Sequence, residues 1–239
     1  MLLVPRKEII QNVFIITPDP NVYGPGSCFG YASGGLLYLI TAGHVIKSLP
    51  HAVEAKLFIY TSNKWEEIKV IPYFASGRSY IDNNGDVDIA VIKTSIQAKS
   101  NLEIDLSNAG CVFGQDVYFL GFPYVGSRIP YLANPINNGK PLPLVKKATL
   151  SSMPMEESPY FFLDGHNNPG FSGGPVTFWD DKTNKQKVLG VVHGYLPHCG
   201  SFSQIEATSS PSVSYLENSG IAIAYNIRYA KDIINELSS

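Results

Sequence analysis

The chain has 239 residues, of which 44% are hydrophobic and 16% are charged. That composition is typical of a globular protein and excludes an intrinsically disordered chain and a coiled coil. With 18 basic and 20 acidic side chains the formal net charge is −2, which excludes a bulk positive field that would gather nucleic acid or an anionic membrane.

The N-terminal segment predicts no export signal. Residues 1–8 include Pro5, Arg6 and Lys7, where a secretory peptide needs an uninterrupted apolar stretch. The apolar run at residues 36–40 is far shorter than the roughly 20 residues of a membrane-spanning helix. We therefore expect a cytoplasmic protein without a membrane span.

Short segments rich in Val, Ile, Tyr and Phe recur along the chain between glycines and prolines, which is typical of β-strands. Their spacing predicts an all-β fold of barrels or a sandwich. The predicted strands are residues 13–16, 36–41, 55–60, 68–71, 89–92, 117–121, 161–163, 188–192 and 221–225.

The remaining segments predict loops, a boundary and one helix. Residues 123–143 and 201–219 are dense in Pro, Gly, Asn and Ser, so we expect mobile surface loops there. The polar stretch 99–110 is the best candidate boundary between two halves. Near the end, apolar residues recur at helical steps and predict a C-terminal helix; they are Ile227, Ala230, Ile233, Ile234 and Leu237.

The three cysteines, Cys28, Cys111 and Cys199, are widely separated along the chain. None forms a CxxC pair, so neither a zinc site nor a redox centre is expected, and no other cofactor is implied. Reduced thiols are the simpler interpretation, and one disulfide is the alternative.

A serine lies among glycines in the segment 170–175, Gly-Phe-Ser-Gly-Gly-Pro, just before an apolar strand. Glycines permit a strained turn there. Such a turn can aim the backbone N–H groups of Gly170 and Ser172 at one point, where the oxyanion of an attacked carbonyl would develop. On this segment alone, a glycine-rich hairpin without catalytic chemistry is the alternative interpretation.

Two other segments carry the groups that a serine nucleophile needs. An apolar strand ends in small residues and His44, which suits a half-exposed general base. Asp88 directly precedes the apolar strand 89–92, so its carboxylate is carried toward the interior, where it needs a partner. His44 would accept the proton of Ser172, and Asp88 would fix the tautomer of His44 and stabilise its imidazolium.

In their order, His then Asp then Ser, these residues resemble the triad of trypsin-like serine peptidases with the chymotrypsin fold. In that family the histidine lies in TAAH or TAGH, the aspartate begins D-[IV]-A-[LV]-[LI], and the serine lies in G-x-SGGP. Residues 41–44, 88–92 and 170–175 match these motifs, and the register favours Asp88 over its rival Asp86. Two further segments, residues 26–30 and 114–123, extend the resemblance to nearly the whole chain. The HtrA-like bacterial branch is resembled by residues 219–224 and by Asp164, Asn168, Pro169 and Gly170.

The resemblance implies two six-stranded antiparallel β-barrels followed by a C-terminal α-helix. Residues 1–105 would form the first barrel, with His44 and Asp88, and residues 106–239 the second, with Ser172, in one compact peptidase unit. No PDZ module is expected after the helix.

The resemblance also implies the activity. We expect a serine endopeptidase that hydrolyses protein or peptide bonds through an acyl-enzyme on Ser172, with Gly170 and Ser172 N–H groups as the oxyanion hole and no metal or other cofactor. Its partners would be a protein or peptide substrate and, as a further candidate, a regulatory protein. A binding module with weak catalysis is the alternative, but such relatives usually lack one triad residue; an esterase is a third candidate.

Two departures from the family pattern bear on activation. Phe171 stands where secreted digestive members have an aspartate that pairs with a newly cut N-terminus. Val45 follows the histidine where many extracellular members have a cysteine, so Cys28 lacks that partner. Both departures fit an enzyme that needs no zymogen cleavage.

By family register the base of the primary specificity pocket lies near His166. Members that cleave after Lys have an aspartate at this base, and this chain has none there, so we expect poor cleavage after Lys or Arg. Polar or acidic residues would be preferred, with small apolar residues as the alternative. Strand alternation turns the His193 side chain toward Asp88, although this residue is also a pocket candidate. The full set of expected substrate-binding residues is His166, Asn167, Asn168, Val192, His193, Gly194 and Tyr195.

Overall fold

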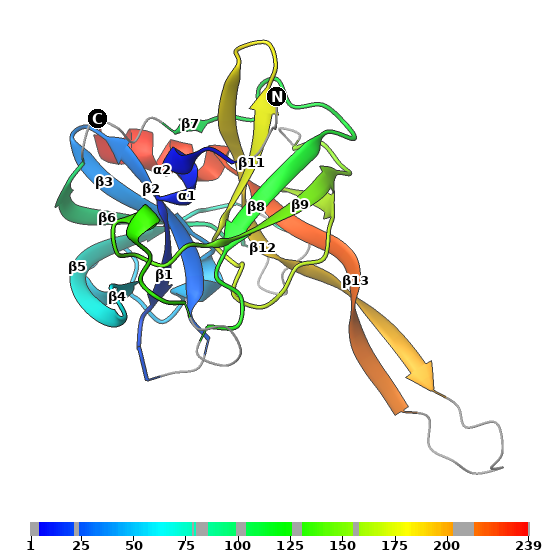
Figure 1. The fold of residues 1–239 in the computed structure, drawn as a ribbon, viewed down its shortest axis with the longest axis horizontal. Helices are drawn as coiled ribbons and strands as arrows, with labels where there is room; N and C mark the ends of the chain where they lie inside the picture. The colour runs from blue at the N-terminus through cyan, green and yellow to red at the C-terminus, as the bar shows by residue number, and fades with distance from the viewer. Residues whose placement is uncertain are drawn as a thin grey trace.

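A computed structural model describes residues 5–21, 24–77, 79, 86–98, 104–125, 131–154, 158–202 and 213–238. Two β-barrels lie side by side, and a C-terminal helix packs against the first of them (Figure 1). The all-β architecture with two six-stranded antiparallel barrels and a terminal helix is therefore confirmed.

The first barrel closes in the strand order β1-β2-β3-β6-β5-β4, and every neighbouring pair is antiparallel. Short apolar strands supply its inward side chains, which include Ile16, Leu39 and Ile92, all fully buried. The strands are β1 (Val13–Thr17), β2 (Gly26–Ser33), β3 (Leu36–Thr41), β4 (Ala55–Thr61), β5 (Lys64–Phe74) and β6 (Ala90–Gln97).

The second sheet has the order β11-β8-β9-β10-β13-β12-β7, and an additional pairing of β11 with β12 closes six antiparallel strands into a barrel. The short β7 adds to β12 in parallel. The strands are β7 (Asp105–Leu106), β8 (Asp116–Gly121), β9 (Leu144–Leu150), β10 (Tyr160–Asp164), β11 (Pro175–Asp180), β12 (Lys185–Phe202) and β13 (Val213–Asn226).

Helices are few. The C-terminal α2 (Arg228–Ser238) confirms the predicted helix and buries Ala230 and Ile234. A short helix that the sequence analysis did not predict, α1 (Lys7–Ile10), lies near the start, and two 3-10 turns are η1 (Gly43–Val45) and η2 (Pro135–Asn137). No helix among the described residues combines the length and the apolar character needed to cross a membrane.

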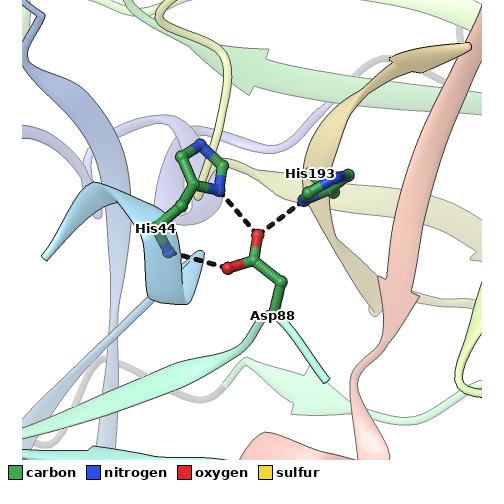
Figure 2. Close-up of side chains that lie close together, drawn as sticks. All are labelled: His44, Asp88 and His193. Atoms are coloured by element: carbon green, nitrogen blue, oxygen red, sulfur yellow. Dashed lines mark hydrogen bonds and ion pairs between the residues drawn. The ribbon is translucent and has the colours of Figure 1, made fainter. Parts of the chain in front are cut away.

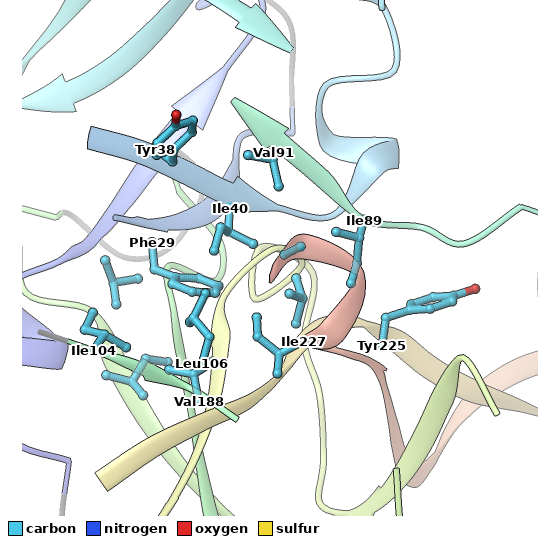
Figure 3. Close-up of a cluster of buried hydrophobic side chains, with 14 of the residues drawn as sticks. Phe29, Tyr38, Ile40, Ile89, Val91, Ile104, Leu106, Val188, Tyr225 and Ile227 are labelled. Atoms are coloured by element: carbon cyan, nitrogen blue, oxygen red, sulfur yellow. The ribbon is translucent and has the colours of Figure 1, made fainter. Parts of the chain in front are cut away.

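A shared hydrophobic cluster joins the two barrels. Figure 3 shows Phe29, Ile40 and Val91 of the first barrel in one cluster with Val188 and Tyr225 of the second. Burying one such side chain contributes about 1.5–3 kcal/mol. Because Ile89 also belongs to this cluster, the residue before it, Asp88, is held at the junction of the barrels.

Two loop predictions were wrong in part. Residues 201–202 and 213–219, expected in a loop, continue β12 and β13, which form a two-stranded hairpin projecting from the barrel (Figure 1). In this hairpin the two strands pair with each other, for example Cys199 with Leu216. Neither strand has a buried face there, so its sequence lacks the apolar alternation by which a strand is predicted. Residues 203–212 lie outside the described part.

The other predicted loop, residues 123–143, is not confined to the surface. Tyr131 is buried, packs on Phe122 with ring centroids 5.0 Å apart and donates its hydroxyl to the carbonyl of Pro123 at 2.9 Å. Asn137 in η2 is also fully buried. Residues 126–130 of this loop and residues 99–103 of the predicted boundary lie outside the described part.

The cysteines are unpaired: Cys28 and Cys111 are buried and Cys199 is exposed. Burial raises the pKa of the Cys28 thiol well above its usual range. Cys28 is therefore an apolar packing residue of the first barrel rather than a reactive thiol.

Candidate active site

His44 and Asp88 meet because β3 and β6 are neighbours. The register pairs Thr41 with Ala90, so the turn that follows β3 and the residues that precede β6 lie at the same end of the barrel. His44 Nδ1 donates to Asp88 Oδ2 at 2.6 Å, and the backbone N–H of His44 donates to Oδ1 at 2.7 Å (Figure 2). The first contact places the His44 proton on Nδ1 and leaves Nε2 as the acceptor.

A second histidine reaches the same carboxylate oxygen. His193 Nδ1 donates to Asp88 Oδ2 at 2.6 Å, from the other barrel (Figure 2). The prediction that the His193 side chain points toward Asp88 is therefore confirmed. His193 lies at a register shift in β12, where Val192 pairs with Ala224 and Gly194 with Ile223, and such bulges re-aim side chains.

The carboxylate of Asp88 is held in its charged form. Burial alone would raise its pKa, but the hydrogen bonds from His193 and His44 outweigh burial and lower the pKa of Asp88 to about 2. The Asp88 side chain is 11% exposed and that of His44 is 41% exposed, so the acid is covered and the imidazole is open to solvent. Asp86, the rival acid, is exposed.

The segment around Ser172 requires glycine at two positions with positive φ. Gly170 has φ +103°, and a Cβ there would lie 2.5 Å from the carbonyl oxygen of Phe122. Gly173 has φ +86°, and a Cβ there would lie 2.0 Å from the carbonyl oxygen of Ser27. The backbone therefore turns where a side chain would not fit, and this turn presents Ser172 at the start of β11.

Ser172 joins the cluster through the main chain of His193. Its Oγ donates to the carbonyl oxygen of His193 at 2.8 Å. Within the described residues, no hydrogen bond links Ser172 Oγ to His44. One residue thus contacts both ends of the predicted triad, Asp88 through its imidazole and Ser172 through its carbonyl.

The backbone N–H groups of Gly170 and Ser172 donate no hydrogen bond to any described residue. The carbonyl of Pro169 accepts from the backbone N–H of Tyr124 at 3.2 Å. Because the C=O and N–H of a trans peptide point in opposite directions, the N–H of Gly170 is turned away from Tyr124. Unpaired N–H groups are what an oxyanion hole needs.

Ser27 on β2 is a residue whose contribution the sequence analysis missed. It is fully buried; its Oγ donates to the carbonyl of Gly170 at 2.7 Å and accepts from the N–H of Phe122 at 3.0 Å. Its backbone N–H donates to the carbonyl of Ser172 at 2.8 Å. Ser27 therefore clamps the turn that carries Ser172 from the other barrel. The family-like segment 26–30 was the one available signal.

The residues predicted for the substrate pocket are placed as follows. Val192 and Asn167 are buried, His166 is exposed, and the others are half-buried, namely Asn168, His193, Gly194 and Tyr195. The side-chain Oδ1 of Asn167 has no hydrogen-bond partner among the described residues.

Lys146 on β9 contacts two of the predicted pocket residues, a contact that the sequence did not predict. Its Nζ donates to the carbonyl oxygen of His166 at 2.5 Å and to Oδ1 of Asn168 at 2.6 Å. Partial burial lowers the pKa of Lys146. No local pattern in the sequence links residue 146 to residues 166–168; the antiparallel pairing of β9 with β10, in which Asp164 lies opposite Thr149, brings them together.

One group of side chains has the composition of a metal site. Ligand atoms of His44, Asp88 and His193 lie within 4.8 Å of one another. Two ligands of a tetrahedral zinc ion with bonds of about 2.0 Å lie roughly 3.3 Å apart. The two contacts of 2.6 Å between Asp88 and the histidines are shorter than that, so hydrogen bonds account for the cluster.

Comparison with known proteins gives a family and a fold. The sequence model of the family described as trypsin-like peptidase domain matches residues 26–191. No curated protein matches the chain. Among solved structures, the inactive form of Rv3671c from M. tuberculosis has a TM-score of 0.55 at 15% identity, over 95% of this chain and 87% of that one.

The HtrA-type protease AlgW, solved with a tripeptide, has a TM-score of 0.56 at 18% identity, over 98% of this chain and 64% of that one. At such identities both likenesses concern the fold alone.

Proposed function

The chain belongs to the trypsin-like peptidase family of serine-type endopeptidases, and we propose that it hydrolyses peptide bonds through an acyl-enzyme on Ser172. The observation that carries this proposal is the 2.6 Å hydrogen bond from His44 Nδ1 to Asp88 Oδ2. It keeps Nε2 of His44 unprotonated, on an exposed imidazole, as a general base requires.

The first step needs a rotation of the nucleophile. Ser172 Oγ leaves the carbonyl of His193, donates to Nε2 of His44 and attacks the substrate carbonyl carbon as His44 takes its proton. The substrate oxygen becomes an oxyanion and accepts from the N–H groups of Gly170 and Ser172. Asp88 stabilises the imidazolium that forms.

The intermediate then collapses. The bond between the carbonyl carbon and the amide nitrogen breaks, the nitrogen takes the proton from His44 Nε2, and the amine product leaves an ester on Ser172. A water molecule gives a proton to His44 and attacks this ester. The acid product leaves as Ser172 Oγ regains the proton.

For specificity we propose poor cleavage after Lys or Arg. The ammonium group of Lys146, bound to His166 and Asn168, adds a positive charge beside the proposed base of the pocket, where no aspartate is present. A cationic side chain would be repelled there. Polar or acidic residues are the expected preference.

The test is hydrolysis of an unfolded protein such as reduced casein, followed by mapping of the cleavage sites. Wild type should cleave, Ser172→Ala should not, and Ser95→Ala, which changes an exposed serine on β6, should match wild type. Cleavage by Ser172→Ala equal to wild type would contradict the acyl-enzyme. Efficient cleavage after Arg would contradict the specificity alone.

A further inference from the structure

Oδ2 of Asp88 is shared by two imidazoles. It accepts Nδ1–H of His44 and Nδ1–H of His193, each at 2.6 Å, while Oδ1 accepts the backbone N–H of His44 (Figure 2). A single histidine would be enough to set up a triad. The second one calls for an explanation.

The His193 ring is firmly placed. Its side chain is 17% exposed, and its plane is nearly perpendicular to those of the His44 and Tyr225 rings, whose centroids are each 5.4 Å away. The Tyr225 hydroxyl is 2.6 Å from the hydroxyl of Ser79. This packing holds Nδ1 of His193 against Asp88 and turns that atom away from a pocket role.

We propose that His193 is a positioning residue whose Nδ1–H holds the Asp88 carboxylate in place. Because His193 and His44 donate to the same oxygen of Asp88, His44 is a weaker base than it would be if it were the only donor to that oxygen. The inference rests on the proposed function. A carboxylate that accepts a second charge-assisted hydrogen bond stabilises the neighbouring imidazolium less. His44 then stays unprotonated, and Ser172 stays reactive, to lower pH.

The groups that face this pair come from several elements. Asp88 lies before β6, His44 in η1 and Tyr225 on β13. The Asp88 carboxylate that accepts from His193 is charged at neutral pH. The proposed effect passes through this carboxylate.

Two substitutions separate the hydrogen bond from the bulk of the ring. His193→Ala removes the donor, whereas His193→Asn keeps an N–H donor close to the position of Nδ1 without an ionisable ring. His198→Ala, an exposed histidine farther along the same strand, is the matched control. Tyr225 packing and folding are checked by thermal melting of each variant.

The direct measurement is the pKa of His44, followed by NMR of its ring carbon in the Ser172→Ala background, which needs no activity. His193→Ala should raise the pKa of His44 by about one. His193→Asn and His198→Ala should leave it close to that of the parent. A shift in both His193 variants, or in neither, would overturn the proposal.

The matching kinetic measurement is the rate of phosphonylation of Ser172 by a fluorophosphonate as a function of pH. For each protein the rate at about pH 5.5 is divided by its maximal rate at high pH. This ratio should be about tenfold lower for His193→Ala than for wild type, because the acidic limb of its pH–rate profile is shifted upward by one pH unit. His193→Asn should stay within about twofold of wild type. Complete failure of wild type to react would refute the proposed function, while the NMR comparison would still decide the role of His193.

If His193→Ala does not fold, the wild type and His193→Asn still test the shared hydrogen bonds on which the proposal rests. Both Nδ1 protons should give low-field NMR resonances in wild type, because both are bound to one charged oxygen, and one should vanish in His193→Asn. A single low-field resonance in wild type that persists unchanged in His193→Asn would contradict the shared arrangement.

Discussion

Ser172 donates its hydroxyl to the main-chain carbonyl of His193 at 2.8 Å. Ser172 is therefore held by the strand that also carries the second donor to Asp88. In the proposed reaction this hydrogen bond must break before His44 can take the proton. The position of β12 therefore affects the proposed base, through Asp88, and the proposed nucleophile, through the His193 carbonyl.

Replacing Asp88 by Asn should lower turnover by on the order of 10⁴ while the fold is kept, because an amide no longer holds His44 in the tautomer with Nε2 free. The measurement is hydrolysis of casein at neutral pH. Asp86→Asn, at an exposed position, is the control and should be silent. The reverse pattern would show that the acid is assigned wrongly.

Ser27→Ala should reduce both stability and reactivity. It leaves the carbonyl of Gly170 and the N–H of Phe122 without their partner in a buried place, which costs about 1–3 kcal/mol. Urea denaturation measures the loss, and the phosphonylation rate of Ser172 should fall with it. Wild-type values for both in Ser27→Ala would exclude the clamp.

Gly173→Ala should destabilise the protein by about 3 kcal/mol or more, since a Cβ would lie 2.0 Å from the Ser27 carbonyl at φ +86°. Gly34→Ala offers a control with a positive φ of +56° and no atom within 4 Å of the added Cβ. Its cost should be about 1 kcal/mol. Equal losses in the two variants would mean that the close approach of the barrels is not what requires glycine.

His44 and Asp88 could be predicted as a pair because each lies at the end of a strongly apolar segment and matches a motif of a known family. That their strands are neighbours in the barrel is seen only in the structure. The direction of His193 followed from alternation along β12. The donor role of Ser27 could not be predicted, because residues 27 and 170 come together only when the two barrels pack. The outer hairpin was missed because its strands face solvent and show no apolar alternation.

The depressed pKa of Asp88 predicts an acid-labile contribution to stability. Its pKa falls from 3.8 to about 2 on folding, so the charged form stabilises the native state above about pH 4. That contribution, about 2 kcal/mol, should be lost as the pH falls from about 4 to 2. Denaturation of wild type and Asp88→Asn between pH 6 and 2 measures it; curves that stay parallel would contradict the assignment.

The most direct test of the account is covalent labelling of the intact protein by a fluorophosphonate, read by mass spectrometry. Wild type should gain one adduct, and peptide mapping should place it on Ser172. Ser172→Ala should gain none, whereas Ser95→Ala should label like wild type. An adduct on another residue, or equal labelling of Ser172→Ala, would contradict the claim that Ser172 is the activated nucleophile.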